Sequence, residues 1–161
     1  MAEQAKKNNK ATILIFSGDM DKVFAAFTIA TGAAASGMDT TMFFTFWGLK
    51  ALQKGNLTGK GFFGRMLGIM NRGGIDRIGP SRFNFGGIGR WMFKKMMSAK
   101  GVTPLPQMLE MAQDLGVKLV ACKMSADVME IRPEDLIDGV TFGGVATMVN
   151  EAANSEFTLF I

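Results

Sequence analysis

The chain has 161 residues, a formal net charge of +4, and a composition in which 48% of the residues are hydrophobic. A chain of this length buries roughly two thirds of the surface that its unfolded form exposes, so we expect one domain that folds without disulfides or metals. One cysteine and no histidine exclude an intramolecular disulfide and the usual zinc and haem ligand sets. We therefore expect no metal, no cofactor and a reducing, cytoplasmic setting.

The sequence also bears on how the protein relates to membranes. The N-terminus around Glu3, Lys6 and Lys7 is polar, which predicts that the chain has no secretory signal. No run of the sequence reaches the roughly 18 to 20 apolar residues of a spanning helix. We therefore expect a soluble protein, at most peripheral to a membrane.

The first third of the chain alternates between strand and helix patterns. The expected elements are a buried strand over 11–16, a helix from Asp19 or Asp21 to Ala35, a strand over 40–46 and a short helix over 47–52. This strand, helix, strand order predicts a right-handed parallel crossover, which is the unit of doubly wound α/β domains.

The middle of the chain breaks this rhythm. Between Lys54 and Lys100 there are ten basic residues and one acid, whereas the remainder has eight basic residues and thirteen acids. Twelve of the twenty glycines lie between Gly55 and Gly101, interleaved with Phe and Met. Structureless connections of that length are uncommon inside compact domains. We therefore predict that residues 54–103 form an insertion with two short helices, near 62–71 and 89–99.

Three roles for this basic, apolar insertion remain open. A lid or an oligomer contact is the simplest role for exposed apolar side chains. A peripheral membrane contact would suit an amphipathic basic segment. A nucleic-acid partner is not expected, because the aromatic residues fall in irregular, glycine-rich segments rather than on a sheet that displays them for base stacking.

Regular alternation resumes after the insertion. The expected elements are a helix over 105–115, a strand over 117–122, a helix over 125–130, a helical turn over 132–137, a strand over 140–142, a helix over 145–154 and a strand over 157–161. The carboxyl ends of parallel strands share one edge of a sheet, where open α/β proteins hold their sites. The residues expected at that edge are Ser17, Gly18 and Asp19, then Phe46, Trp47 and Gly48, then Cys122, Lys123 and Met124, and then Gly143 and Gly144.

Some of these residues also have purely structural explanations. Asp19 can be a helix cap, and Gly143 and Gly144 can serve only the geometry of a turn. The lone thiol of Cys122 can be packed as a small hydrophobic side chain, because unpaired cysteine is among the most buried residue types.

The chemical interpretation of Cys122 depends on its place at the tip of a strand. Ser125 can cap a helix that begins immediately afterwards, and free N–H groups at that helix start, with Lys123 beside them, favour the thiolate. Without histidine, hydrolysis of the papain kind has no base. Without a second cysteine, the chain cannot run a dithiol redox cycle. A lone thiolate can still accept, hold and pass on a group, for example sulfane sulfur as a persulfide.

Five segments together resemble the DsrE/DsrF-like (TusD-like) sulfur-relay family, in its longer branch with a middle insertion. They are residues 44–52, 84–92, 121–125, 132–135 and 143–146. The resemblance implies a flavodoxin-like, three-layer α/β domain with a mostly parallel sheet of about five strands. It also implies a cytoplasmic homo-oligomer, for example a trimer or hexamer, whose Cys122 carries persulfide and exchanges sulfur with TusA-like or rhodanese-like proteins. The longer branch has been associated with membranes.

Two functional hypotheses follow. The first is a sulfur carrier or sulfurtransferase in which Cys122 holds sulfur, supported by Lys123, Ser125, Asp19, Gly18, Trp47, Gly143 and Gly144. The second is a non-catalytic, oligomeric binding module whose insertion binds a small ligand, a partner protein or a membrane surface.

Overall fold

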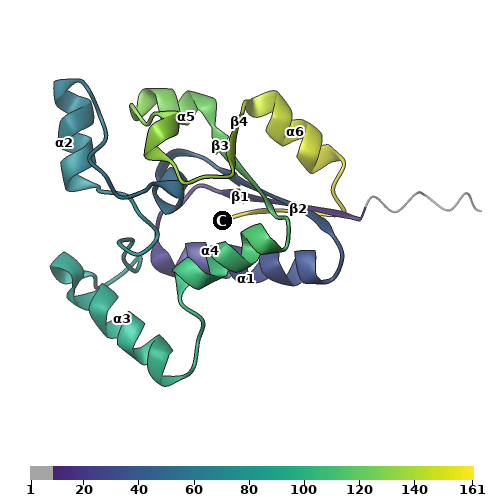
Figure 1. The fold of residues 1–161 in the computed structure, drawn as a ribbon, viewed down its shortest axis with the longest axis horizontal. Helices are drawn as coiled ribbons and strands as arrows, with labels where there is room; N and C mark the ends of the chain where they lie inside the picture. The colour runs from purple at the N-terminus through teal and green to yellow at the C-terminus, as the bar shows by residue number, and fades with distance from the viewer. Residues whose placement is uncertain (1–8) are drawn as a thin grey trace, which may run out of the picture.

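A computed structural model describes residues 9–161 (Figure 1). Within this range, one sheet contains β1 (Lys10–Ile15), β2 (Asp39–Phe44), β3 (Lys118–Cys122), β4 (Val140–Gly143) and β5 (Phe157–Phe160). The strand order is β4-β3-β2-β1-β5, and every neighbouring pair is parallel. Glu3, Lys6 and Lys7, from which the sequence predicts no secretory signal, lie outside the described residues.

Helices cover both faces of the sheet. On one face lie α1 (Met20–Ala35) and α4 (Leu105–Asp114), and on the other lie α5 (Lys123–Val128) and α6 (Val145–Ala153) (Figure 1). This three-layer arrangement confirms the predicted flavodoxin-like α/β fold. None of the helices within residues 9–161 is long and apolar enough to cross a bilayer.

The two faces of the sheet are buried to different extents. Because side chains alternate along a strand, Phe44 and Ala121 join the large core under α1 and α4, whereas Phe43, Val120 and Cys122 form a small cluster on the opposite face. On that face, α6 contributes Met148 to the cluster. No side chain of α6 is itself buried, so the face that carries the cysteine is only thinly covered.

Two boundaries differ from the prediction in ways that matter for the site. The strand predicted to end at residue 46 ends at Phe44, because Phe46 has a left-handed φ of 44° and starts a 3-10 helix, η1 (Phe46–Leu52). The helix predicted to begin after Ser125 begins at Lys123, directly after β3. Thr45 therefore lies just beyond the strand end, and Ser125 lies inside the first turn of α5. The turn predicted over 132–137 is present as η3 (Pro133–Asp135).

The middle segment contains α2 (Phe62–Met70), η2 (Phe85–Gly87) and α3 (Ile88–Ala99), which confirms the two predicted helices. Polar side chains connect it to the α/β domain. The Asn56 amide donates to the Asp135 carboxylate at 2.6 Å. The Glu130 carboxylate accepts the N–H of Gly61 at 2.8 Å, and the Asp21 carboxylate accepts the N–H of Ser81 at 2.8 Å. These contacts position α2 and α3 beside the carboxyl edge of the sheet (Figure 1).

Candidate functional site

Cys122 is the last residue of β3 and the N-cap residue of α5. It is 7% exposed, and its backbone pairs with Gly143 of β4. An N-cap side chain is placed to accept hydrogen bonds from the second and third N–H groups of its helix. In α5 these belong to Met124 and Ser125, which lie near the sulfur, although neither makes a capping hydrogen bond of regular geometry to it.

The polar groups around the sulfur determine its protonation. Burial is the largest single influence on the pKa of Cys122 and raises it. It is outweighed by the polar donors near the sulfur, namely the hydroxyl and N–H of Ser125, the hydroxyl of Thr45 and the N–H of Met124, and the net pKa is lowered. These nearby donors favour the thiolate, which is the nucleophilic form.

Thr45 is a functional candidate that the sequence interpretation missed. Its hydroxyl lies 2.8 Å from the hydroxyl of Ser125, which is fully buried. The predicted strand extended to residue 46, so Thr45 was expected inside the strand and not just beyond its end. A signal was available, because Thr45 is the first polar side chain after the apolar run Met42, Phe43 and Phe44, and β2 is the neighbour of the cysteine-bearing strand.

Lys123 has a different contact from the one expected. Its ammonium group pairs with the Asp127 carboxylate one turn along α5, and both side chains are 59% exposed. Lys123 is not among the groups that shift the pKa of Cys122. The groups that favour the thiolate are therefore hydroxyls and backbone N–H groups, and the expected contribution of the Lys123 charge is absent from this arrangement.

The two glycines after β4 have different surroundings. A Cβ on Gly143 would lie 2.8 Å from Val120 Cγ1 and 3.2 Å from Phe43 Cε2. Gly143 therefore allows close packing beside the cysteine cluster. A Cβ on Gly144, the N-cap residue of α6, would meet no heavy atom within 4 Å.

The remaining predicted residues form a second group at the same sheet edge. A Cβ on Gly18 would lie 2.4 Å from the Trp47 carbonyl oxygen, which shows how closely the β1–α1 loop packs on η1. The Asp19 carboxylate accepts from the Ser17 hydroxyl at 2.8 Å and from Lys22 at 2.9 Å.

This second group lines a cavity of about 540 Å³. Its walls include Gly18, Asp19, Trp47 and Lys50, but not Cys122. The eight predicted residues therefore form two groups at this sheet edge, one around Cys122 and one that lines this cavity. No role for Lys50 was predicted from the sequence. It could have been noticed as a basic residue in the short helix that follows β2.

Comparisons with known proteins agree with this fold. Residues 7–160 match the sequence profile of the DsrE/DsrF/DrsH-like family. The chain is 45% identical over 163 residues to the Bacillus subtilis protein YrkE, described as uncharacterized, with all of both chains covered. It is 30% identical to the sulfur carrier protein DsrE2 of Allochromatium vinosum, over 96% of this chain and 99% of that protein.

A solved structure provides a further comparison. The crystal structure of the ychN protein from E. coli matches with a TM-score of 0.59 at 17% identity, covering 94% of this chain and 98% of that one. At this identity the match supports the fold alone, whereas the profile and the two relatives extend over nearly the whole sequence. This chain belongs to the DsrE/DsrF/DrsH-like family.

Proposed function

We propose that this protein is a sulfur carrier that holds sulfane sulfur on Cys122 as a persulfide and passes it to a partner protein. Family membership and the similarity to a sulfur carrier of Allochromatium vinosum support a sulfur-relay role. The observation that carries the proposal is the place of the single thiol at the end of β3 and the start of α5, beside the hydroxyls of Thr45 and Ser125, where its pKa is lowered. The same donors would stabilise a persulfide anion.

The proposed transfer is an exchange between sulfur atoms with no net oxidation. The Cys122 thiolate attacks the outer sulfur of a donor persulfide, so a new S–S bond forms at Cys122 Sγ. The S–S bond of the donor breaks, and the donor leaves as a thiolate. Delivery is the same exchange in reverse, with a thiolate of the acceptor attacking the outer sulfur on Cys122. The hydroxyls near Sγ stabilise the Cys122 thiolate, which attacks in the first exchange and leaves in the second.

The surface beside Cys122 suits a protein partner. Three exposed apolar side chains lie on the helices that begin next to it: Met124 and Val128 on α5, and Val145 on α6. We propose that TusA-like or rhodanese-like proteins approach here and that the chain assembles as a homo-oligomer in the cytoplasm. In this proposal the chain is one domain, with residues 54–103 as its insertion.

Intact-mass measurement tests the carrier role directly. Purified protein is incubated with a small-molecule persulfide donor, and the mass is recorded without reductant. We expect a gain of one sulfur atom, removed by dithiothreitol and absent from Cys122→Ser. Ser155→Ala serves as a matched control, because its hydroxyl contacts Thr12 on another part of the sheet. A wild-type protein that gains no more sulfur than Cys122→Ser would rule out the carrier role.

A second function is favoured by the surface of the insertion. Phe62 and Phe63 on α2 are 79% and 76% exposed, and Trp91 on α3 is 63% exposed. Basic residues such as Arg65 and Lys95 lie on the same helices. We propose, as the alternative to sulfur transfer, a non-catalytic binding module that uses this basic, apolar surface against a partner protein, a small ligand or an anionic membrane.

Vesicle flotation tests the membrane form of this alternative. Wild-type protein should float with vesicles that contain phosphatidylglycerol and remain behind with phosphatidylcholine alone. The double substitution Phe62→Ser and Phe63→Ser should abolish flotation. Met111→Ser, an exposed apolar position on α4, should not. Equal flotation of all three proteins, or of none, would count against membrane binding by the insertion.

A further inference from the structure

A cationic cavity lies between η1, the end of α2 and the start of α3. It has a volume of about 550 Å³. Five cationic side chains and one carboxylate are among the residues that line it: Lys50, Arg72, Arg77, Arg90, Lys94 and Asp76. The excess of positive charge is concentrated on a concave surface, where a small ligand would contact several of these side chains at once.

Internal contacts leave most of this charge without compensation. Asp76 pairs with Lys94 at 2.5 Å. Arg72 and Arg90 donate to the backbone carbonyls of Gly55 and Arg77. Those contacts orient the guanidinium groups but carry no opposing charge, so four of the five cations are not neutralised by the one carboxylate of the cavity.

Lys50 and Arg77 are the cations that have no such contact. Within residues 9–161, neither side chain has an ion pair or a hydrogen bond. Lys50 is half-buried, and burial lowers its pKa, with a smaller opposing influence from Asp19. A half-buried ammonium group without a partner in the protein is unfavourable, and an anion at this position would relieve that cost.

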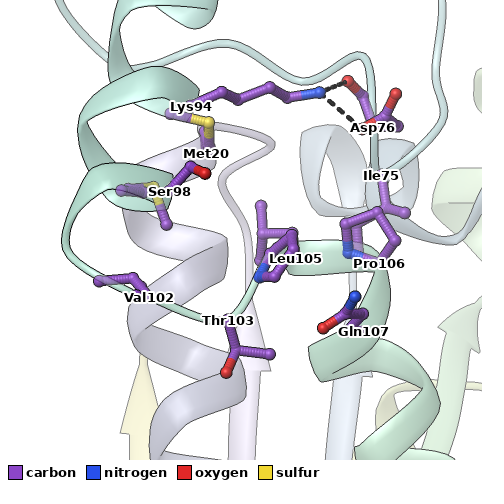
Figure 2. Close-up of a pocket in the computed structure, with 13 residues that line it drawn as sticks. Met20, Ile75, Asp76, Lys94, Ser98, Val102, Thr103, Leu105, Pro106 and Gln107 are labelled. Carbon is purple, nitrogen blue, oxygen red and sulfur yellow. Dashed lines mark hydrogen bonds and ion pairs between the residues drawn. The ribbon is translucent and has the colours of Figure 1, made fainter.

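Two further cavities open beside the cationic one. The first, of about 390 Å³, shares the Lys94–Asp76 pair, which spans its upper rim above apolar residues such as Met20, Val102 and Leu105 (Figure 2). The second is the cavity lined by Gly18 and Trp47, which shares Lys50, Met70 and Asn71. A ligand anchored by its anion in the cationic cavity would therefore have apolar space next to it.

We propose that the cationic cavity binds a small molecule that carries a multivalent oxyanion, such as a phosphate or sulfate group. Guanidinium groups match the geometry of such oxyanions with paired N–H donors. Lys50 supplies an ammonium group from η1, and Arg77 supplies a guanidinium group from the loop between α2 and α3. The site is distinct from Cys122, which is not among the residues that line it.

Calorimetric titration of the full chain with inorganic pyrophosphate tests this site. We expect saturable binding with one site per chain. Lys50→Met and Arg77→Gln should each weaken it about tenfold or more, because each removes a charge-assisted contact. Arg82→Gln is the matched control, since Arg82 is a basic residue of the same insertion that does not line the cavity. Circular dichroism and thermal unfolding establish that each variant is folded.

Titration with phenyl phosphate distinguishes an organic phosphate ligand from a free oxyanion. Tighter binding than inorganic phosphate indicates an organic phosphate whose body enters an adjoining cavity, and equal binding indicates a free oxyanion. The proposal would be overturned if pyrophosphate showed no saturable binding, or if Arg82→Gln lost as much affinity as Lys50→Met and Arg77→Gln. The outcome is separable from sulfur transfer, because Cys122→Ser should bind pyrophosphate unchanged and Lys50→Met should still accept sulfur.

Discussion

The Thr45 and Ser125 hydroxyl oxygens lie 2.8 Å apart, and both hydroxyls help to lower the pKa of the nearby Cys122 thiol. Thr45 follows β2 and Ser125 belongs to the first turn of α5, so the sulfur is held between two elements that are distant in sequence. A thiol packed only as a small hydrophobic side chain would have no such pair of donors. This relationship leads to the first prediction.

Ser125→Ala and Thr45→Val should both raise the pKa of Cys122, because each removes a nearby hydroxyl that favours the thiolate. The expected result is a several-fold slower alkylation by iodoacetamide near neutral pH, with the rate recovered at higher pH. The measurement is the alkylation rate as a function of pH. Lys123→Met is the control and should leave the profile unchanged, since Lys123 pairs with Asp127. A profile that shifts only in Lys123→Met would contradict this account of the site.

Asp135→Asn should destabilise the protein by roughly 2 to 4 kcal/mol at pH 7, because it weakens hydrogen bonds to a charged, fully buried carboxylate. Burial is the largest influence on the Asp135 pKa and raises it, but hydrogen bonds from Arg132 and Asn56 lower it overall. Chemical denaturation of both proteins gives the difference in free energy of unfolding.

The same substitution has a defined pH dependence. Because folding lowers the pKa of Asp135 from its ordinary value of 3.8, the folded state binds fewer protons than the unfolded state. The stabilisation is complete above that value and is lost as the pH falls through the lowered one. The stability gap between wild type and Asp135→Asn should therefore narrow on acidification below about pH 4. A gap that widens with acid would show that the carboxylate is not the stabilising form.

Gly18→Ala should destabilise the protein, whereas Gly144→Ala should leave its stability almost unchanged. The added Cβ on Gly18 would lie 2.4 Å from the Trp47 carbonyl oxygen, so the β1–α1 loop must move away from η1 at a cost of about 1 to 3 kcal/mol. The added Cβ on Gly144 meets no heavy atom within 4 Å and should change stability by less than about 0.5 kcal/mol. Thermal unfolding of the two variants beside wild type tests the contrast, and equal melting temperatures would refute it.

Glu130→Gln should loosen α2. The Glu130 carboxylate accepts the N–H groups of Lys60 and Gly61 at the start of that helix, and these hydrogen bonds lower its pKa. Faster hydrogen exchange is expected in residues 62–70, while the strands exchange at wild-type rates. In wild type the same loosening should appear as the pH falls through the lowered pKa. Glu134→Gln is the control, because Glu134 contacts Arg132 outside the insertion. Unchanged exchange in α2 would contradict this anchoring role.

Much of the fold follows from local sequence patterns. The apolar run 11–16 and the segments around 40–46 and 117–122 predict buried strands, and their alternation with amphipathic helices predicts a parallel sheet. The two helices of the insertion were also expected, because a structureless connection of that length is uncommon inside a compact domain. The boundaries at Phe44 and Lys123 were not, because the left-handed φ of Phe46 and the start of α5 at the end of β3 depend on tertiary packing.

The sequence by itself determined the chemistry available to this protein. With one thiol and no histidine, any thiol chemistry of this chain involves a single cysteine, and the strand pattern puts that thiol at the carboxyl edge of the sheet. Only the tertiary structure decided which groups reach it. Thr45 meets Ser125 because β2 and β3 are neighbours in the sheet, and Lys123 turns to Asp127 because α5 begins without a gap. Hydrogen-bond partners are chosen by distance in space, which local sequence patterns do not encode.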